Sequence, residues 1–397
     1  MAEELKLRRT PLSFAAGSGH LETVEVLLSM RDINADLVDK NGRSPLSWAA
    51  QNGHAPVVRR LLEREDVNPE RTDHDNRSPL FWAAMEGHSA VVELLLEREE
   101  VNPDRTDHNN RSPLFWAAME NHSEVVQLLL EREDVNSGRQ DVDGQTPIYC
   151  AAEGGHWKVV ELLLSREDCQ PDMDPESGRT PLFLAVRAEQ TSIIGQLLRH
   201  RVDANGADFL EATPLIEAAM LGYAGVVKAL LEWPDIRPNL QDQNGQTALF
   251  SASYFDKTEV VRLLLEREDV DPNIRDKEGS TALCIAVQWG YCDVVSALIE
   301  REDTDINLVD NDGKTPLSYA LEEGDERIVS LLQEREKFNS TTPVKETYTS
   351  LTFHEFQLWP SDRNRETFLH PPHTLPCLHT CTLAPALLPF TLLLAQK

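Results

Sequence analysis

Ten copies of one short unit make up most of this chain, and their spacing limits what it can fold into. Each copy begins with Ser or Thr, continues with Pro or Ala, and then has Leu or Ile. The starts are Thr10, Ser44, Ser78, Ser112, Thr146, Thr180, Thr213, Thr247, Thr281 and Thr315. Successive starts are evenly spaced, and only the step from Thr180 to Thr213 is shorter, by a single position. Each such unit buries its apolar face on its neighbours, so the period predicts a linear stack of repeats.

The unit itself is predicted to be a helix, a tight turn and a second helix, as the copy at residues 78–99 shows. Ser78 can cap the first turn, and Pro79 stands where a missing N–H costs nothing. Gly87 ends the first helix, and the apolar run from Val91 to Leu96 has helical spacing. Between units, segments rich in Asp, Asn and Gly, such as residues 39–42, favour a tight hairpin.

The pattern D-x-x-G-x-T-P-L-x-x-A-A-x-x-G-H-x-x-V-V-x-x-L-L resembles the ankyrin repeat, and residues 39–62 and 141–163 carry nearly all of it. The resemblance implies an all-α solenoid of about ten helix-turn-helix repeats with short β-hairpin loops over residues 1–337. Two features differ from the family pattern. The usual His after T-P-L is replaced, for example by Ser47 or Phe81, so its hydrogen bond between repeats is not expected. The links, such as LLEREDVNPE, lack Gly and are similar to those of large fungal ankyrin arrays.

The array is predicted to be irregular near residues 174–212 and to end at residue 337. In the irregular part Pro175 and Gly178 interrupt the hairpin pattern, Gly195 weakens a second helix, and the one shorter interval between repeat starts occurs. We expect local softening there, dividing the array into two sub-arrays. Charged residues at 3–9 and 326–336 are candidate caps. Residues 338–397 have no period and contain many Pro, Ser and Thr, which is typical of a disordered tail.

Charge and cysteine content narrow the possible partners and compartment. The net charge of −29 lies wholly in residues 1–337, because residues 338–397 contain four basic and four acidic residues. An acidic excess disfavours nucleic acid and anionic membranes as partners. The apolar end of the chain, residues 383–395, is shorter than a membrane span, so no stable insertion is expected. Six cysteines without disulfide-type spacing, and no secretory signal, predict a cytoplasmic or nuclear protein. We expect a monomer.

The sequence contains no motif for catalysis, a cofactor or a metal. Phosphate-binding, dinucleotide-binding and nucleophile-elbow motifs are all missing. One His recurs at the turn of repeats 1–5, and neighbouring copies are too far apart to share a metal, so a turn-stabilising role is expected. His and Cys residues at 370–381 fit none of the usual zinc spacings. The series Trp48, Trp82 and Trp116 is predicted to pack between repeats. We therefore predict a protein that is not an enzyme.

The resemblance implies that hairpin tips and first helices form a concave partner-binding face. Two sets of residues occupy its variable positions. The first is a basic ladder, one per repeat, that could hold successive carboxylates or phosphates: Arg43, Arg77 and Arg111. A solvated face neutralised by neighbouring Asp and Glu is an equally good interpretation of that ladder. The second set is apolar and comes from repeats 7–9: Phe209, Leu210, Met220, Leu221, Tyr254, Phe255 and Trp289. Clustered exposed aromatics are typical of a binding hot spot, although some could pack within the irregular repeats.

The favoured function is a scaffold or adaptor that binds a protein partner of unknown identity on the concave face. A second hypothesis is the sensor or regulatory repeat region of a larger signalling protein that lacks its effector domain. An enzyme with its site in residues 338–397 and a self-associating structural protein are further alternatives. Loss of the tail without any phenotype would exclude the enzyme, and the mass in solution tests self-association.

Overall fold

The computed structural model describes residues 9–172, 178–200 and 202–341, and within them it contains twenty helices and no strand. The first helices of the ten repeats are α1 (Pro11–Gly17), α3 (Pro45–Gln51), α5 (Pro79–Met85), α7 (Pro113–Met119), α9 (Pro147–Glu153), α11 (Pro181–Arg187), α13 (Pro214–Leu221), α15 (Ala248–Tyr254), α17 (Ala282–Gln288) and α19 (Pro316–Glu323). The second helices are α2 (Leu21–Leu28), α4 (Ala55–Leu62), α6 (Ser89–Leu96), α8 (Ser123–Leu130), α10 (Trp157–Leu164), α12 (Thr191–Arg199), α14 (Ala224–Leu231), α16 (Thr258–Leu265), α18 (Cys292–Glu300) and α20 (Glu326–Thr341). The predicted all-α solenoid of ten repeats is confirmed.

Every first helix begins at the Ser or Thr that marks its repeat. The hydroxyl oxygen of Ser78 accepts a hydrogen bond from the backbone N–H of Phe81 at 3.2 Å, and Pro79 occupies the first helical turn. The equivalent bond is present in all ten first helices, at 3.0–3.3 Å. This bond satisfies one of the donors that a helix start leaves free. The Ser or Thr at the start of each repeat therefore determines where the first helix of that repeat begins.

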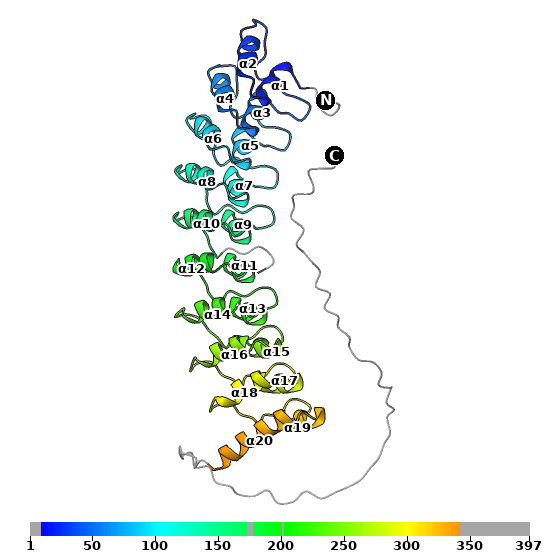
Figure 1. Cartoon of the computed structure of the whole chain (residues 1–397). Helices are drawn as coiled ribbons and strands as arrows, with labels where there is room; N and C mark the ends of the chain where they lie inside the picture. The colour runs from blue at the N-terminus through cyan, green and yellow to red at the C-terminus, as the bar shows by residue number, and fades with distance from the viewer. Residues whose placement is uncertain (1–8, 173–177, 201, 342–397) are drawn as a thin grey trace, which may run out of the picture. The chain divides into compact units, whose positions relative to one another are not determined.

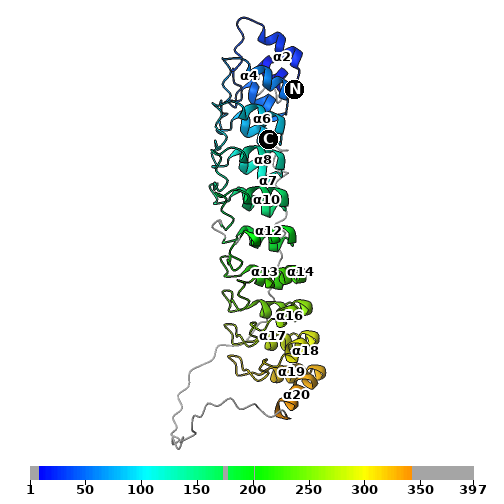
Figure 2. The ribbon, with the colours of Figure 1, turned by 90° about the vertical axis from the view of Figure 1, so that its left-hand side faces the viewer.

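The helices form two layers, with all first helices in one and all second helices in the other (Figure 1). Each first helix contacts the first helices of the repeats before and after it, and the second helices do the same. Alanines such as Ala83 and Ala84, both fully buried, let the first helices approach closely. One continuous apolar core runs from Leu12 to Leu332, and Figure 2 shows the repeats stacked along it. The core is linear, as a solenoid requires.

Hairpin tips project from the first-helix layer and are built as turns. In repeat 2 the N–H of Asp39 donates to the carbonyl oxygen of Arg43 at 3.0 Å. The Asp39 carboxylate in turn accepts from the N–H groups of Asn41 and Arg43, at 2.8 and 3.0 Å. Neighbouring tips are also joined, because the N–H of His74 donates to the carbonyl oxygen of Asn41 at 3.0 Å. The tips thus form a connected edge, although no residue described in them is assigned to a strand.

The His at the turn between the two helices joins neighbouring repeats. Nε2 of His54, His88, His122 and His156 lies 2.9–3.1 Å from a carbonyl oxygen of the preceding repeat. For His88 this acceptor is the carbonyl of Gln51, at the end of the preceding first helix. The His at the turn therefore also links its repeat to the preceding one. The position after T-P-L, where the family has its own His, instead holds buried Phe81, Phe115 and Phe183.

Arginines replace glycine at the end of the second helices. Nη1 of Arg64 donates to the carbonyl oxygen of Leu28, the last residue of α2, at 3.2 Å. The same guanidinium pairs with Asp66 through two bonds of 2.7 and 2.9 Å. Helix ends leave carbonyls without partners, and here the next repeat supplies the donor. Equivalent bonds come from Arg132, Arg166, Arg267 and Arg301. In these links without Gly, an arginine of one repeat therefore caps the second helix of the repeat before it.

The irregular repeat 6 keeps both helices and remains within the stack. α11 contacts α9 and α13, and α12 contacts α10 and α14. Its second helix still buries Ile193, Ile194, Leu197 and Leu198. In repeat 7 a left-handed hairpin position with φ 61° is held by Glu211, where Gly is expected, at a cost of about 1–2 kcal/mol. The predicted softening of residues 174–212 and the division into two sub-arrays stay predictions.

We expect Gly195→Ala to raise the free energy of unfolding by about 1 kcal/mol. A Cβ atom at Gly195 would find only Nη2 of Arg199 nearby, at 3.9 Å, so the methyl group fits. Amide exchange in α12 should be faster than in α6 and α8, and should slow in the variant. Gly222→Ala is the control, because φ there is +81° and a Cβ would lie 2.7 Å from Cδ of Lys257. Equal exchange rates in α12 and α6 would refute local softening.

Some sequence predictions fall outside the described residues. These are residues 3–8 of the first candidate cap, residues 342–397 of the predicted tail, and the His and Cys group at 370–381. Residues 338–341, predicted to belong to the tail, instead continue the last helix. The described helix α20 is the longest, with 16 residues, and contains the whole of the second candidate cap. None of the described helices is both long and apolar enough to cross a membrane.

Candidate partner-binding site

Large apolar side chains gather where three consecutive first helices end. α13 ends at Met220 and Leu221, α15 ends at Tyr254 and is capped by Phe255, and α17 is capped by Trp289. Since α15 contacts both α13 and α17, these ends are neighbours in the stack. The repeat register thus aligns side chains that are a full repeat apart in the sequence.

The aromatic members of this group are in contact with one another. The ring centroid of Tyr254 lies 4.9 Å from that of Phe255 and 5.7 Å from that of Trp289, with interplanar angles of 71° and 73°. Edge-to-face packing of this kind is favourable by about 0.5–1.5 kcal/mol per pair. Phe255 and Trp289 are nevertheless 45% and 54% exposed. We call Tyr254, Phe255 and Trp289 the aromatic cluster, a preformed apolar surface on rigid helix ends.

The aromatic cluster and the preceding Leu221 are local to repeats 7–9. Leu221, Phe255 and Trp289 share one position of the repeat, eight residues after the capping Thr. In the other repeats this position holds Ser18, Asn52, Glu86, Glu120, Gly154, Ala188 and Glu323. The array therefore presents one apolar region on this row and not a continuous stripe.

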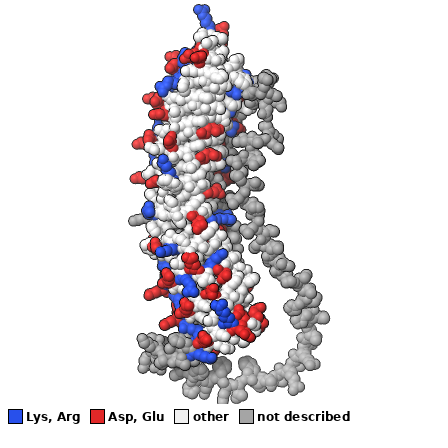
Figure 3. Space-filling view, in the orientation of Figure 1, with Lys and Arg blue, Asp and Glu red and all other residues white. Residues whose placement is uncertain are grey.

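Acidic residues surround the aromatic cluster. Asp256 follows Phe255 directly and is exposed, and Glu323 is exposed at the equivalent position of the next repeat. Burial, together with Asp256, raises the pKa of Tyr291 on the same side of the cluster. On the side of the second helices, the left of the view, acidic and basic side chains are interspersed (Figure 3). The exposed charges named here are acidic, and the partly exposed Lys257, which follows Asp256, is a basic side chain on the same side.

Phe209 and Leu210 belong to a different part of the surface. They lie in the hairpin tip before α13, whereas Met220 and Leu221 end that helix, which is about 12 Å long. Phe209 is 62% exposed and has the guanidinium of Arg179 5.9 Å from its ring centroid. The carbonyl oxygen of Leu210 accepts from the N–H of Gln243 at 2.9 Å. The predicted apolar set is therefore divided between helix ends and a hairpin tip.

The first member of the predicted basic ladder, Arg43, is buried between two indoles. Its Cζ lies 3.8 Å from the ring centroid of Trp48 and 4.0 Å from that of Trp82, and the residue is only 6% exposed. Cζ of Arg9 lies 3.8 Å from the ring centroid of Trp48, and Cζ of Arg77 lies 4.3 Å from the ring centroid of Trp82. Burial lowers the pKa of Arg43 to about 10. Arginine and tryptophan thus alternate along repeats 1–3.

Arg77 and Arg111 are engaged by carboxylates of the array itself. Arg77 pairs with Asp73 at 3.0 Å and also with Asp75. Arg111 pairs across the repeat boundary with Asp141 at 2.9 Å, and less closely with Asp143. These forked donors therefore hold hairpin tips in place. The fixed spacing of five residues between Arg and Trp in repeats 2–4 is the signal in the sequence that would have indicated this stacking.

Comparison with known proteins decides the family. A family model described as ankyrin repeats (3 copies) matches overlapping segments that together cover residues 2–343. The chain belongs to the ankyrin-repeat family. The crystal structure of the human ASB11 ankyrin repeat domain is similar, with 26% identity and a TM-score of 0.50 over 58% of this chain and 100% of that one. The crystal structure of EF0377, an ankyrin repeat protein, is 28% identical, with a TM-score of 0.45 over 47% of this chain and 96% of that one. The search for similar curated proteins found no match.

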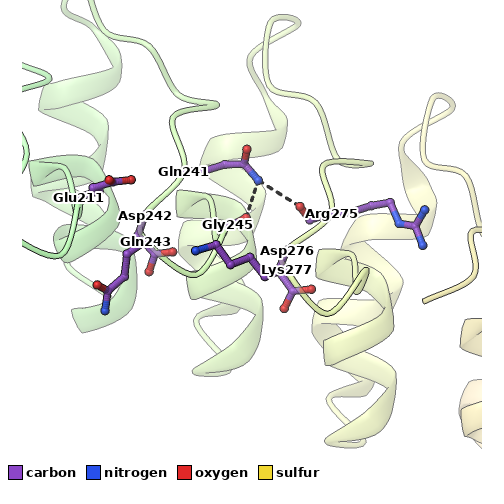
Figure 4. A pocket seen from close by; sticks show the side chains of 8 residues that line it. All are labelled: Glu211, Gln241, Asp242, Gln243, Gly245, Arg275, Asp276 and Lys277. Atoms are coloured by element: carbon purple, nitrogen blue, oxygen red, sulfur yellow. Dashed lines mark hydrogen bonds between the residues drawn. The ribbon is translucent and has the colours of Figure 1, made fainter. Parts of the chain in front are cut away.

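Ankyrin repeats are protein-interaction modules, and their fold is a non-catalytic scaffold. In this ankyrin array a hollow of about 480 Å³ opens between the hairpin tips of repeats 7–9 (Figure 4). It is lined by Glu211, Gln241, Asp242, Gln243, Gly245, Arg275, Asp276 and Lys277. Nε2 of Gln241 donates to the carbonyl oxygens of Gly245 and Arg275, at 2.6 and 3.0 Å. The lining of the hollow is polar and includes both acidic and basic side chains. Its chemistry therefore differs from that of the apolar aromatic cluster.

Thiols and groups of possible metal ligands are two types of side chain that can carry chemistry. The described cysteines are Cys150, Cys169, Cys284 and Cys292, all free thiols. Burial raises the pKa of Cys150 and of Cys169 to about 12, so both are protonated at neutral pH. Among the residues that the structure describes, no three His, Cys, Asp or Glu side chains are placed to hold a metal ion.

Proposed function

We propose that the array is an adaptor that binds a segment of another protein on the face formed by first helices and hairpin tips. The observation that carries this proposal is the aromatic cluster, which is exposed although its rings pack on one another. Binding energy at protein interfaces is concentrated in a few such aromatic residues. Because the cluster is fixed on helix ends, little ordering is needed when a partner docks.

The charge around the cluster supports a partner segment with apolar side chains flanked by Lys or Arg. Asp256 and Glu323 are exposed beside the cluster, and the chain carries a net charge of −29. Complementary charges speed association and select partners, whereas the apolar contacts supply affinity. We place this binding in the cytoplasm or nucleus, because free thiols are typical of reducing compartments.

Affinity capture from a cell lysate with the full-length chain tests the proposal. We expect Phe255→Ala combined with Trp289→Ala to weaken retention of the captured proteins about tenfold or more, since both side chains would lose buried contact area. Trp157→Ala is the matched control. Trp157 is 52% exposed, close to the 54% of Trp289, but lies at the start of the second helix α10.

Direct binding measurements on the purified partner should reproduce the difference between these variants. Raising the salt concentration should slow association with the wild-type chain, because the proposed partner is basic around its apolar contacts. Equal retention by the wild type and the double variant would contradict the site, and an acidic captured segment would contradict the partner chemistry.

A further inference from the structure

The turn after each first helix contains one position with a left-handed backbone, where φ lies between 55° and 81° in all ten repeats. Seven repeats have Gly at this position and repeat 4 has Asn121, residue types that adopt the conformation readily. Repeats 6 and 8 instead have Glu189 and Asp256, both at φ 55°. These two turns are strained relative to Gly, and each presents an exposed carboxylate.

The strained turn of repeat 8 adjoins the aromatic cluster. Asp256 directly follows Phe255, and its carboxylate acts on Tyr291 of the next repeat, because burial and the charge of Asp256 raise the pKa of that hydroxyl. Gly at residue 256 would remove the strain, so the fold itself does not require the carboxylate. Residues held in strained conformations are concentrated at sites that bind ligands. The carboxylate is therefore a candidate contact for a partner.

The Asp256 carboxylate has no partner within the array. None of the described side chains or backbone N–H groups forms a hydrogen bond or an ion pair with it. The neighbouring Lys257 turns towards the preceding repeat, since its Cδ lies 2.7 Å from where a Cβ atom of residue 222 would be. Within the described ranges, no Lys or Arg side chain stacks on a ring of the aromatic cluster either. An unpaired anion thus lies beside exposed rings.

Repeat 3 shows what a carboxylate and an aromatic ring hold together in this array. Arg77 pairs with Asp73 at 3.0 Å, and its Cζ also lies 4.3 Å from the ring centroid of Trp82. A guanidinium is planar, so it can bond a carboxylate through its edge while it contacts a ring. Lysine carries a compact charge and lacks this double fit. The combination of Asp256 and exposed rings therefore favours arginine over lysine.

We infer that Asp256, together with the aromatic cluster, binds an arginine side chain of the partner segment. The guanidinium bonds the Asp256 carboxylate and lies against the exposed rings of Phe255 and Trp289. This contact rests on the proposed function, and it names the side chain that the site selects. It also explains why a strained residue occupies this turn, because Gly would relieve the strain but could not hold the cation.

Selection from a random peptide library displayed on phage, with the full-length chain as the target, supplies a probe. We expect the retained peptides to share an arginine next to apolar or aromatic residues. In the tightest peptide, replacing that arginine with citrulline, which is neutral and of similar shape, should weaken binding about tenfold or more. Asp256→Asn should weaken binding of the original peptide equally. Citrulline should then add little to the loss, because both changes remove the same contact.

Two further variants separate binding from folding. Asp256→Gly removes the carboxylate together with the strain, so it should bind as weakly as Asp256→Asn but unfold at the wild-type temperature or above it. A lower unfolding temperature would assign the carboxylate a structural role and overturn the arginine contact. Glu120→Gln is the control, because Glu120 is an exposed carboxylate at the end of α7, far from the cluster in the repeat order. It should bind the peptide as the wild type does.

Three results of the selection also overturn the arginine contact: no retained peptide, retained peptides without arginine, or equal binding by Asp256→Asn and the wild type. Phe255→Ala combined with Trp289→Ala then shows which proposal has failed. If this double variant loses the peptide while Asp256→Asn keeps it, the aromatic cluster remains the site and only the arginine contact is wrong. If the double variant also binds as the wild type does, the proposed site itself is wrong.

Discussion

Truncating Phe115 to alanine is expected to lower the free energy of unfolding by about 3–5 kcal/mol. The side chain is 1% exposed and contacts a second apolar cluster formed with Tyr149, Cys150 and Leu184 of the next two repeats. Its ring also packs against Trp116 at a centroid distance of 6.4 Å. The truncation removes a large apolar surface and leaves a cavity between repeats, which the rigid backbones on both sides can fill only in part.

Denaturant titration followed by circular dichroism measures this loss, and the chain contains a matched control. Phe209→Ala makes the same chemical change at a side chain that is 62% exposed, so it should shift stability by about 0.5 kcal/mol or less. Since each repeat is stabilised by its neighbours, the Phe115 variant should also separate the unfolding of the two halves of the array. A small loss at Phe115 would mean that the neighbouring repeats close the cavity.

Most of the fold could be predicted from the sequence because its signals are local and repeated. Ser78 marks a helix start through its own hydroxyl, and the near-constant period carries that information to nine other places. The ends of the second helices were less predictable. A missing Gly indicated only that the link differs, whereas the actual cap comes from an arginine of the following repeat, such as Arg64 on Leu28.

The candidate site was predictable in composition but only partly in geometry. Phe255 and Trp289 occupy the same position of consecutive repeats, and Tyr254 directly precedes Phe255, so the sequence could place the three together. The burial of Arg43 was harder to predict, because a charged side chain in a hairpin is normally expected to be exposed to solvent. Its burial depends on two indoles from different repeats, Trp48 and Trp82, and such stacking offsets the desolvation of the charge. The spacing of five residues indicates the contact with Trp48 in the same repeat, whereas the contact with Trp82 crosses the repeat boundary and is not visible in the pattern of a single repeat.

Replacing Arg301 with methionine should lower the free energy of unfolding by about 3 kcal/mol. The Arg301 side chain is 13% exposed and pairs with Asp303 at 2.8 Å. Its guanidinium also donates to the carbonyl oxygens of Leu265, Arg267, Glu268 and Val270, at 3.0, 2.8, 3.2 and 2.7 Å. Methionine fills a similar volume but leaves these carbonyls, at the end of α16 and in its link, without a charged donor.

Arg98→Met is the matched control, because among the described residues the Arg98 guanidinium bonds Glu100 and no carbonyl of the preceding repeat. This pair is exposed, so its loss should cost less than about 1 kcal/mol. Equal losses in the two variants would show that the ion pairs within each link, and not the carbonyl bonds between repeats, stabilise the array. A large difference would mean that this arginine couples each repeat to its predecessor.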